Sequence, residues 1–329
     1  MKKFFLLIST ACLLLGFHCA KEEPELYTIG IFQVNDAPTL NTARSGFLQA
    51  LEDQGLENGV NVRLILKNGY GDIAEVQRIA QEFVVRKVNM IVPFSTPCLQ
   101  AALHATQEIP IVFSSVANPY RAGAGTSPED HLENVSGVSS RGPIRQGLQF
   151  IKEVLPDVER LGTLWTPSEV NSEYYLELAR EAAADLGMKL FDVPIANSSE
   201  VLWSAQMLLN KKIEVIYQIS DNTINEAFEA LGQVAVENTI PLFGGFPLST
   251  RQGACAALGW DFFQMGYETG KIALRVKAGE KPVNIPFHYL EEVKMVINLY
   301  AAEAQGVTFP PEIIDRADEI VHNRNFLGQ

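Results

Sequence analysis

Three short polar segments hold the side chains that could bind a small molecule: Ser95-Thr96-Pro97, Asn171-Ser172 and Asp221-Asn222. Thr96 is a good N-cap residue, and Pro97 suits the first position of a helix. Such a helix would present free N–H groups and a partial positive charge, which suit a carboxylate. Asp221 could accept hydrogen bonds from a ligand ammonium group. Together these features suggest an amino-acid site, although the same residue types could merely cap helices.

The sequence contains no pattern typical of catalysis or of metal binding. His104, His131, His288 and His322 have no catalytic spacing, and the Ser/His/Asp, GxSxG, Walker and GxGxxG patterns are absent. The four cysteines include no CxxC pair, so a zinc site has no support. We therefore expect no catalytic residue, cofactor or metal. An enzyme of the same shape is the alternative class, and it would need paired acid–base groups.

Alternating strands and helices are expected to position these segments. Short apolar runs alternate with helical spacing from Leu26 onward, which is typical of parallel α/β units. Expected strands cover residues 27–32, 62–66, 88–93, 109–113, 134–138, 160–165, 189–193, 214–219 and 240–243. Expected helices cover residues 39–55, 73–86, 144–154, 172–186, 200–210 and 224–236, with a further helix opening at Pro97.

The alternation restarts after residues 139–142, which predicts an α/β protein of two Rossmann-like lobes with parallel sheets and a cleft between them. Ligands of open α/β sheets bind beyond the carboxyl ends of the strands, at such crevices. All three polar segments lie in loops that follow expected strands, so we expect them to line the cleft.

Length and composition narrow the class of protein. The 329 residues suggest two domains, at roughly 100–200 residues per domain. With 47% hydrophobic and 20% charged residues, the chain is neither disordered nor a polytopic membrane protein. A formal net charge of -13, without a basic stripe, argues against binding to nucleic acid.

The amino terminus predicts export. Met1-Lys2-Lys3 is followed by an uncharged apolar run from Phe4 to Phe17, so residues 1–18 are expected to be a signal peptide. Cys19 stands where a bacterial lipoprotein is acylated, and residues 19–26 would be the lipidated tether. His18 departs from the small residue that usually precedes this cysteine. An ordinary signal peptide with an incidental cysteine is therefore the alternative.

From about Tyr27 to Val321 the chain resembles the periplasmic substrate-binding proteins of bacterial ABC transporters, of the tryptophan or aromatic amino acid type and the type I fold. The matching motifs, in chain order, are Gly30-Ile31-Phe32-Gln33, Ser95-Thr96-Pro97-Cys98-Leu99-Gln100, Ile109-Pro110-Ile111-Val112-Phe113-Ser114-Ser115-Val116, Asn134-Val135-Ser136-Gly137-Val138, Glu169-Val170-Asn171-Ser172, Asp221-Asn222 and Gly253-Ala254-Cys255-Ala256. Two segments depart from the family. Ala37-Pro38-Thr39-Leu40-Asn41 stands where His-Pro-Ala-Leu-Asp is frequent, and Asn118-Pro119 replaces the usual Asp-Pro.

The resemblance implies a hinge with three crossings and closure around one small ligand. It implies an N-terminal lobe of residues 27–139 with about 257–283, and a C-terminal lobe of residues 140–256 with about 284–329. The expected ligand-binding residues are Gln33, Ser95, Thr96, Ser115, Asn171, Ser172, Asp221 and Asn222.

The resemblance also implies a function. The protein is expected to bind an amino acid, with an aromatic one as a candidate, and to deliver it to an ABC permease and its ATPase. Its only attachment to the membrane would be a lipid at Cys19. Two alternatives stay open: a ligand-sensing protein for a membrane receptor, and a different ligand such as a nucleoside or a sugar.

Overall fold

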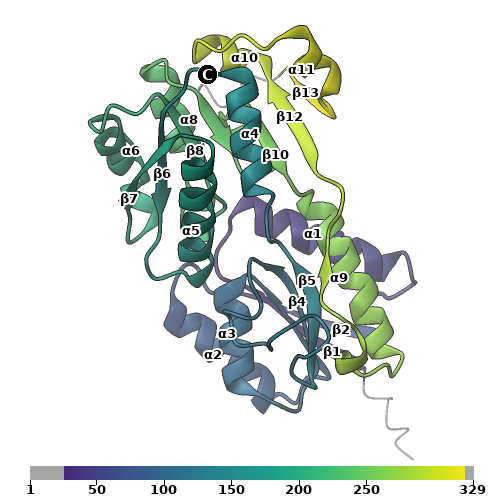
Figure 1. The fold of residues 1–329 in the computed structure, drawn as a ribbon. Coiled ribbons are helices and arrows are strands. Elements are labelled where there is room, and N and C mark those ends of the chain that lie inside the picture. The colour runs from purple at the N-terminus through teal and green to yellow at the C-terminus, as the bar shows by residue number, and fades with distance from the viewer. Residues whose placement is uncertain (1–25, 323–329) are drawn as a thin grey trace, which may run out of the picture.

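Two β-sheets organise the chain, one in each of two lobes (Figure 1). The structure is a computed structural model that describes residues 26–322. The first sheet has six strands in the order β11-β5-β4-β3-β1-β2, and all of its pairs are parallel. Its strands are β1 (Tyr27–Gln33), β2 (Val62–Asn68), β3 (Met90–Phe94), β4 (Ile111–Val116), β5 (Val135–Ser139) and β11 (His288–Tyr289).

The second sheet has seven strands in the order β13-β12-β10-β9-β8-β6-β7. Its strands are β6 (Arg160–Trp165), β7 (Lys189–Pro194), β8 (Val215–Gln218), β9 (Leu242–Gly244), β10 (Ala256–Gly259), β12 (Lys294–Asn298) and β13 (Glu319–Val321). The pair β10–β12 is antiparallel, and the other pairs are parallel. The predicted α/β fold of two Rossmann-like lobes is thus confirmed, with one antiparallel pair added.

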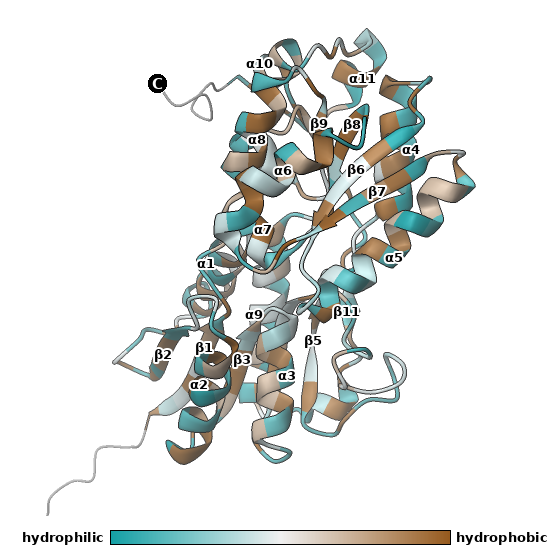
Figure 2. Cartoon of the chain, turned by 90° about the vertical axis from the view of Figure 1, so that its left-hand side faces the viewer, coloured by the Kyte–Doolittle hydropathy of each residue, from teal (hydrophilic) through white to brown (hydrophobic). Residues whose placement is uncertain are grey.

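Helices cover both sheets. Those of the first lobe are α1 (Pro38–Glu52), α2 (Ile73–Val85), α3 (Thr96–Ala105), α9 (Phe262–Lys277) and the 3-10 turn η3 (Pro282–Asn284). Those of the second lobe are α4 (Ile144–Val154), α5 (Val170–Asp185), η1 (Ser198–Glu200), α6 (Val201–Leu209), α7 (Asn222–Glu226), α8 (Phe228–Glu237), η2 (Pro247–Gln252), α10 (Leu299–Ala304) and α11 (Pro311–Arg316). Because helices cover both faces, the inner strands β3 and β4 are buried along their whole length, and β3 consists only of apolar residues (Figure 2).

Two glycines explain why α9 packs in the first lobe although it lies far along the chain. A Cβ atom on Gly46 of α1 would stand 2.0 Å from the backbone oxygen of Phe263, and one on Gly266 of α9 would stand 1.7 Å from that of Ala43. Only glycine permits this approach, which brings the two helices into direct backbone contact.

The chain crosses between the lobes three times, which confirms the predicted hinge. It passes to the second lobe after β5, returns to the first between β10 and α9, and crosses again between β11 and β12. These last two crossings lie near residues 260–261 and 290–293, a few residues beyond the expected positions of about 257 and about 284. Strand β11 has only two residues, and β10 consists mainly of alanine and glycine, so neither gives a clear strand pattern in the sequence.

The predicted signal peptide, the tether and Cys19 lie outside the described residues. Within residues 26–322, no helix has the length and apolar character needed to span a bilayer.

Candidate ligand-binding site

The carboxyl ends of the two sheets face each other, and the predicted ligand-binding residues come from these ends. In the first lobe, they lie at the carboxyl ends of β1, β3 and β4, and they are Gln33, Ser95, Thr96 and Ser115. Asn171, Ser172, Asp221 and Asn222 follow strands β6 and β8 of the second lobe. Across the cleft, α3 contacts α5 and α1 contacts α7. Figure 2 shows the start of α5 directly above α3.

On the first-lobe side, the hydroxyl of Thr96 is buried and has no partner. Ser95, not Thr96, is the N-cap of α3: its Oγ accepts a hydrogen bond from the Cys98 N–H at 3.5 Å. The helix therefore begins one residue earlier than the sequence predicted. Thr96 is only 1% exposed, and its Oγ1 makes no hydrogen bond. A buried hydroxyl without a partner is costly, unless a ligand supplies that partner.

Gln33 and Ser115 contact their own lobe. The Gln33 amide donates to the Asn35 carbonyl oxygen at 2.7 Å and to Asn41 Oδ1 at 2.8 Å, and its Oε1 accepts from Arg44. The Ser115 hydroxyl lies 3.6 Å from the Met265 sulfur. These bonds occupy the Gln33 amide on both its oxygen and its nitrogen.

On the second-lobe side, Glu169 connects the loops that follow β6 and β8. Its Oε1 accepts from the Thr223 N–H at 3.0 Å and from the Thr223 hydroxyl at 2.7 Å. Its Oε2 accepts from the Asn222 N–H at 3.2 Å, the Asn222 amide at 2.7 Å and the Asn171 amide at 2.8 Å. This buried carboxylate thus fixes both Asn171 and Asn222.

Asp221 makes the reciprocal connection between the same two loops. Its Oδ1 accepts from the Ile224 N–H at 2.9 Å, which caps α7, and from the Thr166 hydroxyl at 3.1 Å. Its Oδ2 accepts from the Thr166 N–H at 3.0 Å, a group that also bonds the Ser172 hydroxyl oxygen at 2.9 Å. Burial, together with the nearby charge of Glu169, raises the pKa of Asp221 to about 7.

The two carboxylates have no cationic partner. Within residues 26–322, none of the ion pairs includes Glu169 or Asp221. Beside them, Asn171 Oδ1 and Asn225 Oδ1 are buried acceptors without a donor. The second lobe therefore offers negative charge and open acceptors, the complement of an ammonium group.

The lobes touch on both sides of the cleft. The Asn35 amide donates to the Asn222 carbonyl oxygen at 2.9 Å and to Glu226 Oε2 at 3.3 Å. Elsewhere along the cleft, Arg121 Nη2 lies 2.5 Å from Glu177 Oε2. These contacts describe a closed arrangement of the lobes.

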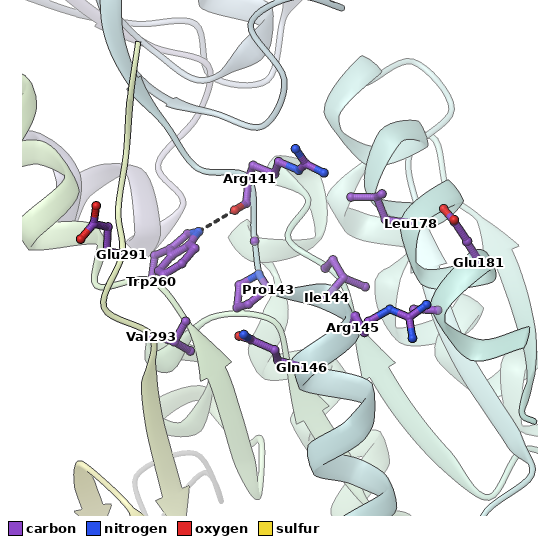
Figure 3. A pocket seen from close by; sticks show the side chains of 12 residues that line it. Arg141, Pro143, Ile144, Arg145, Gln146, Leu178, Glu181, Trp260, Glu291 and Val293 are labelled. Carbon is purple, nitrogen blue, oxygen red and sulfur yellow. Dashed lines mark hydrogen bonds between the residues drawn. The ribbon is translucent and has the colours of Figure 1, made fainter. Parts of the chain in front are cut away.

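Two cavities lie at the hinge. The outer pocket has a volume of about 500 Å³, and Figure 3 shows it between the start of α4, the middle of α5 and the hinge segments. The inner cavity is narrow, and its lining residues are Ser140, Gly142, Ile144, Tyr175, Ser220, Gly245, Trp260 and Phe262. Gly142, Ile144 and Trp260 line both cavities, so they form the wall between them.

Sequence reasoning missed Glu169 and Asn225 as site residues. Glu169 was visible within a family motif, as an acid in a strand-to-helix loop, but four of its five bonds reach residues more than 50 positions away. Asn225 offered no signal, since it lies within a helical pattern. No three His, Cys, Asp or Glu side chains in the described part of the chain are grouped so that they could hold a metal ion.

Comparisons with known proteins agree on one family. A family model described as ABC transporter substrate binding protein matches residues 28–321. A tyrosine-binding protein of Clostridioides difficile (strain R20291) is 35% identical over 270 residues, which cover 82% of this chain and 78% of that protein.

Two solved structures bear on the arrangement of the lobes. A structure from Streptococcus pneumonia in complex with L-Trp has a TM-score of 0.86 at 24% identity and covers 90% of this chain and 100% of that one. A ligand-free, open substrate-binding protein with adhesive properties from Clostridium difficile has a TM-score of 0.67 at 31% identity and covers 90% of this chain and 99% of that one.

Proposed function

Because the chain belongs to the ABC transporter substrate-binding protein family, we propose that it captures an α-amino acid in the cleft between its lobes. The amino acid carries an aromatic side chain, and the protein delivers it to a membrane permease. The observation on which this proposal rests is the set of buried polar atoms without partners, Thr96 Oγ1 on one side of the cleft and Asn171 Oδ1 and Asn225 Oδ1 on the other.

The first lobe binds the ligand carboxylate. Thr96 Oγ1 can donate a hydrogen bond, and the amino-terminal end of the ten-residue helix α3 adds a partial positive charge. Because Ser95 already caps the helix, the Thr96 hydroxyl is free for a ligand.

The second lobe binds the ligand ammonium group. Asn171 Oδ1 and Asn225 Oδ1 accept its hydrogen bonds directly, since the oxygens of Asp221 are already occupied by donors of their own lobe. Glu169 and Asp221 supply the compensating negative charge from just behind these acceptors. Asn222 supports the site through its bonds to Glu169.

The relatives support an aromatic amino acid. One is described as a tyrosine-binding protein, and one structural neighbour holds L-Trp. The present structure is closer in TM-score to the L-Trp complex than to the ligand-free open structure, although its sequence is more similar to the latter. This difference supports closure of the lobes around a ligand.

Family membership also supports the cellular role. The protein is exported, is attached to the membrane through a lipid on Cys19, and hands its ligand to a permease driven by an ATPase. It performs no chemistry on the ligand, so the ligand should be recovered unchanged.

A thermal-shift screen of amino acids, sugars and nucleosides, followed by calorimetry on the hits, tests this function. We expect aromatic amino acids to raise the melting temperature and to bind with a stoichiometry of one. Stabilisation by sugars or nucleosides alone, without any amino acid, would refute the proposal.

A further inference from the structure

We propose that the side chain of the bound amino acid is recognised at the hinge, where the indole of Trp260 is the movable wall that decides which side chains enter. This inference rests on the proposed function, since it needs an amino acid in the cleft. It assigns to Trp260 a role in specificity.

Ser220 connects the ammonium acceptors to the hinge. The Asn225 amide donates to Ser220 Oγ at 3.3 Å, and Ser220 in turn lines the inner cavity. Strands β8, β9 and β10 are neighbours in the second sheet, and Ser220, Gly245 and Trp260 follow their carboxyl ends. A ligand held by its ammonium group at Asn225 therefore has its side chain beside this cavity.

The lining of the inner cavity suits an aromatic ring. Three of its residues are aromatic, Tyr175, Trp260 and Phe262, and none of its lining residues is charged. Gly142 and Gly245, which have no side chains, also line it. Aromatic rings attract one another in edge-to-face or offset-stacked pairs, so a ring fits such walls better than an aliphatic side chain of similar size.

Trp260 can move because its far side faces open space. Figure 3 shows its indole at the edge of the outer pocket of about 500 Å³, opposite the start of α4. The indole Nε1–H donates a hydrogen bond to the Arg141 carbonyl oxygen at 2.8 Å. An outward rotation of the ring into the outer pocket would break this bond and enlarge the narrow inner cavity.

Gly142 allows the size of the cavity to be tested without disturbing the fold. A Cβ atom there would lie 3.7 Å from the Tyr175 ring and 3.8 Å from Ile144, which are ordinary contact distances. An alanine at this position should thus fold normally and take up space that a ligand ring needs.

Competition calorimetry with L-phenylalanine and L-leucine tests the inference on the full exported chain. We expect Trp260→Leu to lower the affinity ratio of phenylalanine over leucine by about tenfold, because ring-to-ring contacts are lost. Gly142→Ala should lower the affinity for phenylalanine more than that for leucine. Gln146→Ala is the matched control, since Gln146 is exposed and lines the outer pocket but not the inner cavity.

The outcomes separate the two claims. If the wild-type protein binds amino acids but both Trp260→Leu and Gly142→Ala keep its affinity ratio within twofold, the inference is wrong and the proposed function stands. If Trp260→Leu does not fold, Gly142→Ala alone decides the inference in the same way. If the wild-type protein binds no amino acid, the proposed function fails, and this inference fails with it.

Discussion

Replacing Thr96 by valine should change stability and affinity in opposite directions. Valine has nearly the same shape as threonine, and the Thr96 hydroxyl is buried without a hydrogen-bond partner in this closed arrangement. Removing an unsatisfied buried polar group recovers its desolvation cost, about 1–3 kcal/mol. The unliganded Thr96→Val protein should therefore melt higher by a few degrees.

The same change should weaken ligand binding. A hydrogen bond to a charged group contributes about 1.5–3 kcal/mol, so the affinity for an amino acid should fall about tenfold or more. Differential scanning calorimetry and titration calorimetry measure the two effects on one sample. Ser136→Ala is the control, because that buried hydroxyl donates to the Ile285 carbonyl oxygen at 2.8 Å. It should lower stability and leave affinity unchanged.

The reasoning about Thr96 is refuted if Thr96→Val lowers the melting temperature and keeps the affinity within twofold. That pair of results would mean that the hydroxyl stabilises the fold and does not meet a ligand.

Three further predictions concern charge, closure and anchoring. Burial and the charge of Glu169 raise the pKa of Asp221 to about 7. The folded state therefore favours the protonated carboxyl, and the stability that this protonation contributes is complete below about pH 4 and is lost as the pH rises through about 7. The melting temperature of the unliganded protein should fall from pH 5 to pH 8, while the affinity for amino acids rises. A melting temperature and an affinity that both stay constant over this pH range would contradict the assignment to Asp221. Asn35→Ala removes the bond to the Asn222 carbonyl oxygen, so small-angle scattering of the ligand-bound protein should show a larger radius of gyration than that of the wild type. An unchanged radius would mean that the bond does not hold the lobes together. Cys19→Ala should move the protein from the membrane fraction to the soluble fraction, and a wild-type protein that is already soluble would argue against lipidation.

Local patterns were enough to predict most of the fold. The nine expected strands correspond to β1 to β9, because each buried strand of a parallel sheet is a short apolar run bounded by turns. The two-residue strand β11 could not be found in this way, since only its pairing with β5 defines it. The helix expected at residues 224–236 is divided into α7 and α8 at Ala227. The apolar spacing continues through both helices, so periodicity could not reveal the break.

The candidate site was only partly predictable, because local rules identify capping residues but not the atoms that capping leaves free. Thr96 and Ser95 were equally suitable caps for α3, and the structure assigns the cap to Ser95. Asp221 does cap α7, as the alternative interpretation held, and its remaining bonds go to Thr166 in another loop. Contacts between distant loops of this kind depend on the sheet that aligns β6 with β8, which no local spacing encodes.

Titration calorimetry with L-tyrosine, N-acetyl-L-tyrosine and L-tyrosinamide tests the central claim most directly. The account predicts that L-tyrosine binds and that each derivative loses at least tenfold in affinity, because one lacks the ammonium group and the other the carboxylate. Equal affinity for all three compounds, or no binding of L-tyrosine or any other amino acid, would contradict it.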